Sequence, residues 1–254
     1  MSLLEVKNLT LKYGKKTILN DVSFSVEEGQ WLMIIGPNGA GKSTIVNCVS
    51  QTADYTGTIT YRGQDLKKYK PVDLARNIGI LAQKHYVGYS FSVAEVVRLG
   101  RYSYAPGIFS RKDTSDEDMV AEAMEMTGLT SIAGQSVLTL SGGELQRTFL
   151  AQLFAQNPNI LILDEPTNHL DLVYQKQIFA LVKKWLSEKE GRAVISVVHD
   201  LSLAKAYGTA ALLLNKGNVM AFGDTKEAFA PEKINEAYTM DVYAWMREML
   251  EQWK

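Results

Sequence analysis

Apolar and polar residues alternate along the first 28 residues of the chain, in two runs at positions 4–11 and 22–26. A period of two puts every second side chain on the same face, so both runs predict strands that bury one face and pair antiparallel. Residues 57–61 predict another strand, which ends at the turn Arg62-Gly63. We therefore expect the chain to begin with an antiparallel sheet.

Unbroken apolar runs of strand length follow at 31–35, 160–163 and 193–198. Such runs are typical of strands buried on both faces, in a sheet that helices cover. A hairpin is predicted at 210–222, where a turn at 215–218 separates two apolar runs. All of these runs are far shorter than the ~20 residues that a membrane-spanning helix needs, so we predict no membrane span.

Helical spacing of apolar residues is found at 44–50, 93–99 and 115–127. Ser115 is the predicted N-cap of the third helix, because three acidic residues follow it in the first turn, and Gly128 ends that helix. The pattern predicts one α/β domain over 1–254. Its core is expected at about 1–84 and 156–222, with a helical insert at about 85–155 and a helical tail at about 225–254.

Composition narrows the classes of function. The 254 residues include 27 basic and 28 acidic ones, which gives a net charge of −1. A nucleic-acid-binding protein normally has a basic excess or a basic stripe, so we expect no nucleic-acid partner. Cys48 is the single cysteine, which excludes an intrachain disulfide and fits a reducing compartment. Glu5 interrupts the core that a signal peptide would need.

A glycine-rich loop joins the strand at 31–35 to the helix at 44–50. It matches the phosphate-binding P-loop in full, with Gly36, Pro37, Asn38, Gly39, Ala40, Gly41, Lys42, Ser43 and Thr44. Backbone N–H groups of such a loop surround phosphates, and the helix N-terminus adds a partial positive charge. Lys42 is expected to neutralise the β- and γ-phosphates, and Ser43 to hold Mg²⁺. The sequence thus predicts a site for a nucleoside triphosphate.

Two carboxylates end the apolar run at 160–163. Asp164 is placed to bind Mg²⁺ directly or through water, and Glu165 to take a proton from an attacking water. Adjacent carboxylates after a strand also occur in plain solvated loops, and the P-loop is what favours the catalytic interpretation. His199 follows the run at 193–198 and could hydrogen-bond the γ-phosphate, although a histidine there is more often structural. Gln83 carries no signal of its own.

Residues 140–144, Leu-Ser-Gly-Gly-Glu, form a second turn of small residues at the start of a predicted helix. Ser141 can cap this helix, and Gly142 and Gly143 leave its first N–H groups open to an anion. One γ-phosphate does not need two such turns from the same chain. The second turn is therefore expected to serve a nucleotide bound to another chain.

With these motifs in this order, the sequence resembles the ATP-binding cassette (ABC) family over nearly its whole length. The resemblance implies an ATPase with a P-loop NTPase core, an N-terminal antiparallel β subdomain and an inserted α-helical signature subdomain. It implies that Tyr13 stacks on adenine and that Gln83 senses Mg²⁺. Ser141 and Gly143 would clamp the ATP of the opposite chain, Asp171 would cross the dimer seam, and His199 would hold the γ-phosphate.

Residues 89–101 and the Thr-Asn-His-Leu-Asp form at 167–171 resemble ATPases of bacterial importers for iron–siderophore, haem and cobalamin cargo. Many of those relatives continue with Pro-His soon after the arginine, whereas this chain has 102–106, Tyr-Ser-Tyr-Ala-Pro. The implied partners are a second ATPase copy, permease subunits in the membrane and, indirectly, a substrate-binding protein. The implied location is the cytoplasmic face of the cell membrane. A non-transport ABC ATPase, such as one for iron–sulfur assembly, and the ATPase of an exporter remain alternatives.

Two surfaces are candidates for contact with partners. Tyr86, Tyr89 and Phe91 flank a predicted helix, where they either pack internally or form a groove for a permease helix. In the tail, six apolar residues between Val242 and Trp253 fall on one helical face. That face packs either on the chain's own core or against a second copy.

Overall fold

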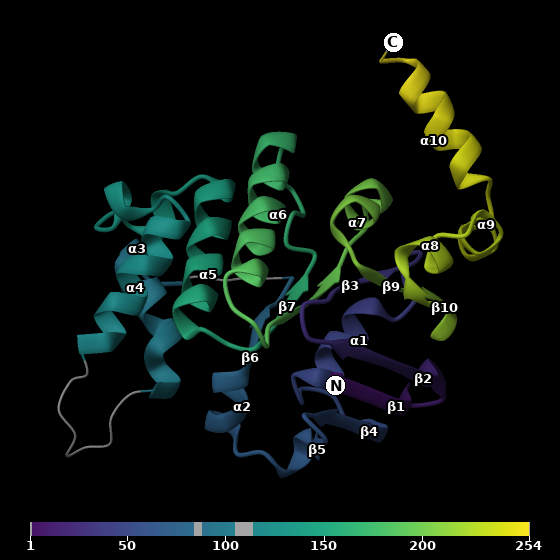
Figure 1. Ribbon diagram of the computed structural model, residues 1–254, viewed down its shortest axis with the longest axis horizontal. Coiled ribbons are helices and arrows are strands. Elements are labelled where there is room, and N and C mark those ends of the chain that lie inside the picture. Colours follow the sequence, from purple (N-terminus) through teal and green to yellow (C-terminus); the bar gives the residue numbers. More distant parts are fainter. Residues whose placement is uncertain (1, 84–87, 105–113, 254) are drawn as a thin grey trace. The chain divides into compact units, whose positions relative to one another are not determined.

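A computed structural model describes residues 2–83, 88–104 and 114–253. The chain forms two compact units, one made of residues 1–68 and 195–254 and the other of residues 69–194. Helices and strands of each are labelled in Figure 1. The single-domain organisation expected from the sequence stays a prediction.

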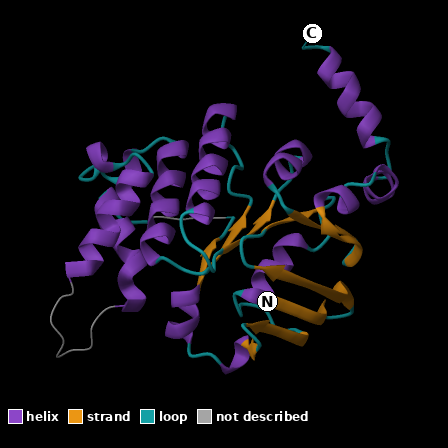
Figure 2. Cartoon of the chain, viewed as in Figure 1, coloured by secondary structure: helices purple, strands orange, loops and turns teal. Residues whose placement is uncertain are grey.

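The first unit contains the antiparallel sheet (Figure 2). Its order is β2-β1-β4-β5, with β1 at Ser2–Tyr13, β2 at Lys16–Glu27, β4 at Thr56–Tyr61 and β5 at Gln64–Asp65. Leu4 pairs with Val26 and with Tyr61, and Val6 pairs with Phe24 and with Ile59. These alternating apolar side chains are buried, which confirms the strands predicted from the period-two pattern.

A mixed sheet completes the first unit. β3 (Trp31–Ile35) runs parallel to β9 (Ala210–Asn215), and β10 (Asn218–Asp224) pairs antiparallel with β9. The boundary between the units falls within β8 (Ala193–Val197), between Val194 and Ile195. The later residues of β8 lie beside β3, and the Trp31 indole donates to Ser196 Oγ at 2.8 Å. All five residues of β3 are buried, as expected for a strand covered on both faces.

Helices of the first unit follow these strands. α1 (Lys42–Val49) comes after β3, and α7 (Leu201–Tyr207) comes after β8. The tail contains α8 (Thr225–Ala228), α9 (Pro231–Tyr238) and α10 (Val242–Glu251), and a short 3₁₀ turn closes the N-terminal part at Leu66–Lys68.

The second unit is mainly helical. Its two parallel strands are β6 (Ile78–Leu81) and β7 (Ile160–Asp164). Its helices are α2 (Pro71–Asn77), α3 (Val93–Arg98), α4 (Thr114–Met126), α5 (Gly142–Gln156) and α6 (Leu172–Ser187), with 3₁₀ segments at Leu99–Tyr104, Thr130–Ile132 and Val137–Thr139. α5 packs against α3, α4 and α6 (Figure 1).

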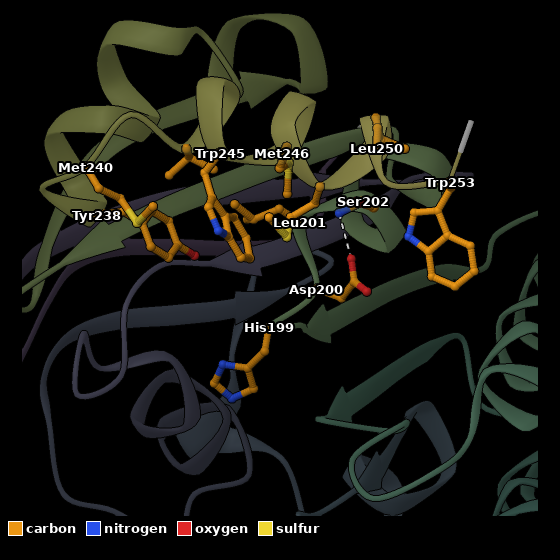
Figure 3. A pocket seen from close by; sticks show the side chains of 12 residues that line it. His199, Asp200, Leu201, Ser202, Tyr238, Met240, Trp245, Met246, Leu250 and Trp253 are labelled. Carbon is orange, nitrogen blue, oxygen red and sulfur yellow. Dashed lines mark hydrogen bonds between the residues drawn. The ribbon is translucent and has the colours of Figure 1, made fainter.

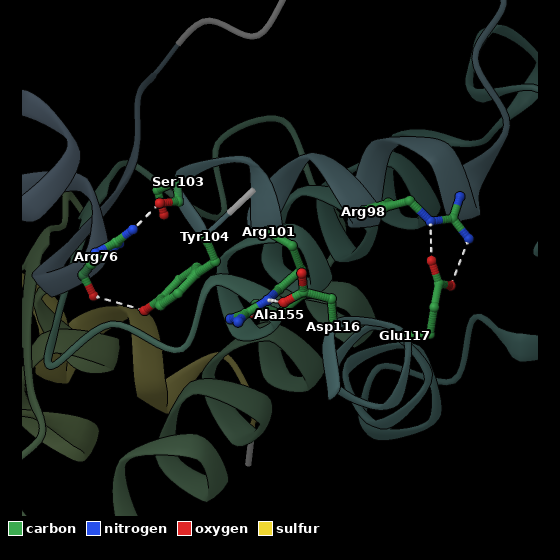
Figure 4. Close-up of polar contacts among 8 residues, drawn as sticks. All are labelled: Arg76, Arg98, Arg101, Ser103, Tyr104, Asp116, Glu117 and Ala155. Carbon is green, nitrogen blue, oxygen red and sulfur yellow. Dashed lines mark hydrogen bonds and ion pairs between the residues drawn. The ribbon is translucent and has the colours of Figure 1, made fainter. Parts of the chain in front are cut away.

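One helix start differs from the sequence prediction. α4 begins at Thr114, so Ser115 lies in the first turn and is not the N-cap. The acidic residues of that turn instead reach back to the segment before it. Arg98 forms a bidentate ion pair with Glu117, in which both N···O distances are 2.9 Å. The Arg101 guanidinium donates to Asp116 at 2.7 Å (Figure 4). In the described part of the chain, no helix is both long and apolar enough to cross a bilayer.

Candidate nucleotide site

The P-loop connects β3 to α1 in a backbone path that glycine permits. Gly36, Gly39 and Gly41 all have positive φ values, of 144°, 76° and 103°. A Cβ atom at Gly36 would collide with the carbonyl oxygen of Leu214 in β9, and one at Gly41 would lie 2.7 Å from the Leu19 side chain. Larger residues therefore do not fit at either place, and glycine allows this close, left-handed backbone path.

Lys42 begins α1, and its side chain turns back over the loop. The residue is only 5 % exposed, and its Nζ donates to the carbonyl oxygens of Gly36 at 2.8 Å and Pro37 at 3.0 Å. Ser43 and Thr44 follow in the first turn, which contains no acidic residue. A helix N-terminus, an ammonium group and a glycine backbone together fit the charge and shape of a polyphosphate.

Tyr13 lies in the same unit as the P-loop. It is 59 % exposed at the end of β1, where it pairs with Lys16 of β2. Ile18 and Leu19, slightly further along β2, lie against Gly41. The β1–β2 turn therefore offers an aromatic face at the P-loop end of this unit.

His199 is also placed near the P-loop within this unit. The preceding residue, Val198, donates its N–H to the carbonyl of Ile34 at 3.2 Å, two residues before Gly36. His199 itself is exposed. It lies at the edge of a cavity of about 640 Å³ whose other walls are mostly apolar residues of the tail (Figure 3). Asp200 caps α7 there by accepting from the Ser202 N–H at 2.7 Å.

The tail also approaches the P-loop itself. The Tyr238 hydroxyl of α9 is buried, and this burial raises its pKa to about 12, while an interaction with the Gly36 backbone opposes the shift. Val242, at the start of α10, is 3 % exposed. By contrast, Trp245, Met249, Leu250 and Trp253 are between 41 and 87 % exposed. Of the two alternatives for this helical face, packing on the chain's own core holds for Val242 but not for these four exposed residues.

Glu165 follows β7 in the second unit, with a left-handed backbone at φ 53° that is uncommon for a residue with a side chain. Its Oε2 accepts from the Gln83 amide at 2.7 Å and from the Asn168 amide at 3.0 Å. Two residues expected to be functional, Gln83 and Glu165, are thus in direct contact. Asn168 is a third member that the sequence analysis did not identify, because an asparagine in a loop carries no signal of its own.

Asp164 ends β7 and is 6 % exposed. In the second unit, the Asp164 carboxylate and the Gln83 amide are oxygen donors of the type that Mg²⁺ prefers, and in the first unit the Ser43 hydroxyl is another. Among the described residues, no group of three histidines, cysteines or acidic side chains gathers as a metal cluster. Each of these oxygen donors by its chemistry fits Mg²⁺, which is commonly held by one or two protein groups together with phosphate and water.

The signature turn lies at the N-terminus of α5. Ser141 is the N-cap in a reciprocal capping box, because Glu144 N–H donates to its Oγ at 3.3 Å and its own N–H donates to Glu144 Oε2 at 2.9 Å. The Ser141 hydroxyl also donates to Glu144 at 2.7 Å, and these bonds lower the pKa of the Glu144 carboxyl. The cap fixes the start of α5, whose first N–H groups have no acceptor inside the helix.

Asp171 is the N-cap of α6, where its Oδ1 accepts from the Tyr174 N–H at 3.0 Å. It is exposed, which a residue at a subunit seam would have to be. The expected site residues are thus divided between the units. Tyr13, the P-loop and His199 belong to the first, and Gln83, Asp164, Glu165, the signature turn and Asp171 belong to the second.

The aromatics beside α3 were predicted either to pack internally or to form a groove, and their exposure decides between these alternatives. Tyr89 and Phe91 are 75 and 40 % exposed, with ring centroids 6.1 Å apart, so these two aromatics do not pack internally; Tyr86 is outside the described residues.

Cys48 is fully buried in α1, and burial raises the pKa of its thiol to about 11. A thiol in that state is a packing group and not a nucleophile.

Comparison with known proteins agrees with this geometry. Residues 19–168 match the family model described as ABC transporter. Ferric enterobactin transport ATP-binding protein FepC of Escherichia coli (strain K12) is 37 % identical over 91 % of this chain and 85 % of its own length. Hemin import ATP-binding protein HmuV of Thermobifida fusca is 35 % identical over 94 % of this chain and 83 % of its own.

The ABC transporter ATP-binding protein YvrA of Bacillus subtilis is 38 % identical over 96 % of this chain, but the chain spans only 55 % of that protein's length. Among solved structures, a metal-chelate type ABC transporter in an inward-facing conformation has a TM-score of 0.81 and 26 % identity, covering 94 % of this chain and 90 % of its own. The matched residues 19–168 include the P-loop, Gln83, the signature turn, Asp164 and Glu165. The chain therefore belongs to the ABC transporter family, as an ATP-binding ATPase.

Proposed function

We propose that the chain is the ATPase subunit of an importer for iron–siderophore or haem-type cargo, and that it works as a dimer with two shared ATP sites. One observation carries the dimer. A single chain presents two helix N-termini suited to phosphate, the P-loop before α1 and the signature turn before α5. One γ-phosphate needs only one such cradle from its own chain, so the second serves the nucleotide of the other copy.

Each residue then has a role that follows from its chemistry. The P-loop N–H groups and Lys42 bind the β- and γ-phosphates, and Tyr13 offers its exposed ring to the base. Glu165 accepts the proton of the attacking water, and the Gln83 and Asn168 amides hold its carboxylate in place. His199 donates to the γ-phosphate, and Asp171 meets the other copy.

Ser43, Gln83 and Asp164 would hold Mg²⁺. When bound, the ion supplies positive charge that stabilises the charge developing on the transferred phosphoryl oxygens.

The cargo class is supported by the relatives' names. FepC is a ferric enterobactin transport protein, and HmuV is a hemin import protein. An importer ATPase also requires permease subunits, which we place at the exposed Tyr89–Phe91 surface, on the cytoplasmic side of the membrane. A substrate-binding protein would act on the far side.

Mixing two inactive variants tests the shared sites. Lys42→Ala removes the ammonium from the P-loop of its own chain, and Ser141→Arg blocks the signature turn offered to the other chain. Each variant alone should be nearly inactive, because both sites of its homodimer contain a defect. A mixed dimer has one complete site, so phosphate release should reappear when the two proteins are combined.

The control is each variant mixed with itself at the same total concentration. Differently tagged chains must first be shown to form mixed dimers by pull-down with Mg-ATP. If mixed dimers form and no phosphate release returns, the shared-site model is wrong.

A further inference from the structure

The two glycines of the signature turn have different surroundings. Neither has a backbone conformation that demands glycine. A Cβ atom at Gly142 would only touch Leu170 at 3.8 Å, which is an ordinary contact. At Gly143, which is buried, a Cβ atom would lie within 2.6 Å of three ring carbons of Tyr174. The space above Gly143 is therefore already filled by an aromatic ring.

Tyr174 is held in that position from two sides. Its backbone N–H donates to the Asp171 carboxylate at 3.0 Å, which fixes the first turn of α6. On the α5 side, the Arg147 guanidinium lies 5.7 Å from the centroid of the ring, within the range of a cation–π contact. The ring is thus a wedge between the starts of α5 and α6.

A second bond joins the same two segments. Gln146 of α5 donates to the carbonyl oxygen of Pro166 at 2.7 Å, one residue after Glu165. The start of α5 is therefore tied to the loop at 165–171 near both ends of that loop. Because the signature N–H groups lie on the first turn of α5, the Tyr174 ring sets where those groups point.

We propose that Tyr174 is a positioning residue, which seats the signature turn through ring contact with Gly143 so that the turn can receive the nucleotide of a second copy. This inference rests on the proposed shared sites. It predicts that the ring matters and the hydroxyl does not. It also predicts that the effect falls on the other chain's nucleotide.

The first test is a pair of substitutions at this position. Tyr174→Ala leaves a gap beside Gly143, and a displacement of about 1 Å at a binding group can lower the rate about 10²-fold, so we expect a loss of that order in kcat/KM for ATP. Tyr174→Phe keeps the ring and should retain the kcat/KM of the parent chain. Binding of ATP to the chain's own P-loop, measured on monomers with a fluorescent ATP analogue, should be unchanged in both. Gln177→Ala, an exposed change on the same helix, is the matched control.

Mixed dimers give the decisive test. Tyr174→Ala combined with Lys42→Ala should regain phosphate release, because the Tyr174→Ala chain supplies the P-loop and the Lys42→Ala chain supplies a well-seated signature turn. Tyr174→Ala combined with Ser141→Arg should regain nothing, since both defects lie in the signature turn. The reverse pattern would mean that Tyr174 acts on its own chain's nucleotide and would overturn the proposal.

Two further measurements keep the outcome unambiguous. If Tyr174→Ala unfolds, Tyr174→Leu replaces it, because leucine retains bulk without the flat ring. Gly143→Ala should lower the melting temperature in the parent chain and lower it less beside Tyr174→Ala; equal losses would contradict the wedge. Rescue by the Lys42→Ala and Ser141→Arg pair, without rescue by the Tyr174→Ala and Lys42→Ala pair, would reject this inference and leave the shared sites standing.

Discussion

Glu165 combines a left-handed backbone with a carboxylate oxygen that accepts from two amides. A backbone conformation of this kind persists only where neighbouring groups hold it, and the Glu165 carbonyl accepts from the Asn168 N–H at 3.2 Å. If Glu165 is the base, as we propose, the Gln83 and Asn168 amides hold its carboxylate in one orientation, which favours transfer of a proton from a single bound water.

Replacing Glu165 with glutamine should therefore separate ATP binding from hydrolysis. The amide oxygen can still accept from Gln83 and Asn168, but it cannot take a proton. Turnover should fall by about 10²–10⁴-fold while ATP binding persists. Phosphate release gives the rate, and gel filtration with Mg-ATP should show an accumulated dimer. Glu190→Gln is an exposed control, and near-normal hydrolysis by Glu165→Gln would remove Glu165 from the role of base.

The residues that sequence reasoning found and missed differ in how local their signal is. The P-loop is contiguous: its glycines are proposed to act through the backbone, and its lysine and serine through side chains carried by the same nine residues. Tyr174 was missed because its partner, Gly143, lies on another helix, and the sequence does not reveal that they meet. Asn168 was missed because one amide in a loop resembles any other until Glu165 is seen beside it.

At the scale of elements, buried strands were the most predictable. Residues 31–35 form β3 as expected, and the hairpin at 210–222 was identified correctly as β9 and β10. Helix starts were less predictable, since α4 begins at Thr114, before the predicted cap Ser115. The ion pairs of Asp116 and Glu117 with the arginines before α4 could not be predicted, because they depend on how α3 and α4 pack.

The segment before α3 presents exposed aromatic side chains on a backbone that is held by hydrogen bonds. Tyr89 and Phe91 are exposed, yet Phe91 is anchored, because its carbonyl accepts from Val137 N–H at 2.9 Å. Ser92 and Glu95 add a reciprocal capping box at the start of α3. Exposed aromatics on a fixed backbone are typical anchors for a partner.

Crosslinking should detect that partner. Cysteine at position 89 (Tyr89→Cys) should be the only reactive thiol, because the native Cys48 is buried with a raised pKa. With a short bifunctional reagent it should join to a loop of the co-expressed permease. Val72→Cys, exposed on α2, is the matched control. Labelling of position 89 that does not change when the permease is present would contradict docking at this segment.

At the scale of the whole molecule, only the start of α10 in the tail is held against other residues. Val242 is buried and the Tyr243 hydroxyl donates to the Phe229 carbonyl, but the later apolar residues of α10 are exposed. They line a cavity together with His199, which we propose to contact the γ-phosphate of an ATP shared with a second copy. That continuity favours the second copy as the cover for this apolar surface.

Deleting residues 241–254 should leave a folded chain that associates more weakly. Losing the buried Val242 and part of Tyr243 removes about 2 kcal/mol, which lowers the melting temperature by about 4–8 °C in a chain of this size. Sedimentation velocity with Mg-ATP should show fewer dimers. Leu250→Ser with Trp253→Ser, in the full-length chain, should weaken dimers without the thermal loss. Unchanged sedimentation of both would leave the tail without a role in assembly.

The exposed tryptophans of the tail should also affect the intrinsic fluorescence of the protein. Trp31 and Trp185 are at most 2 % exposed, whereas Trp245 and Trp253 on and just after α10 are 49 and 87 % exposed. The four indoles therefore divide into a shielded pair inside the body of the chain and a solvated pair at its end. Intrinsic emission should contain a blue component that soluble quenchers reach poorly and a red component that they reach readily. The protein carries its own optical reporter of whether the end of the chain is covered, with no dye attached.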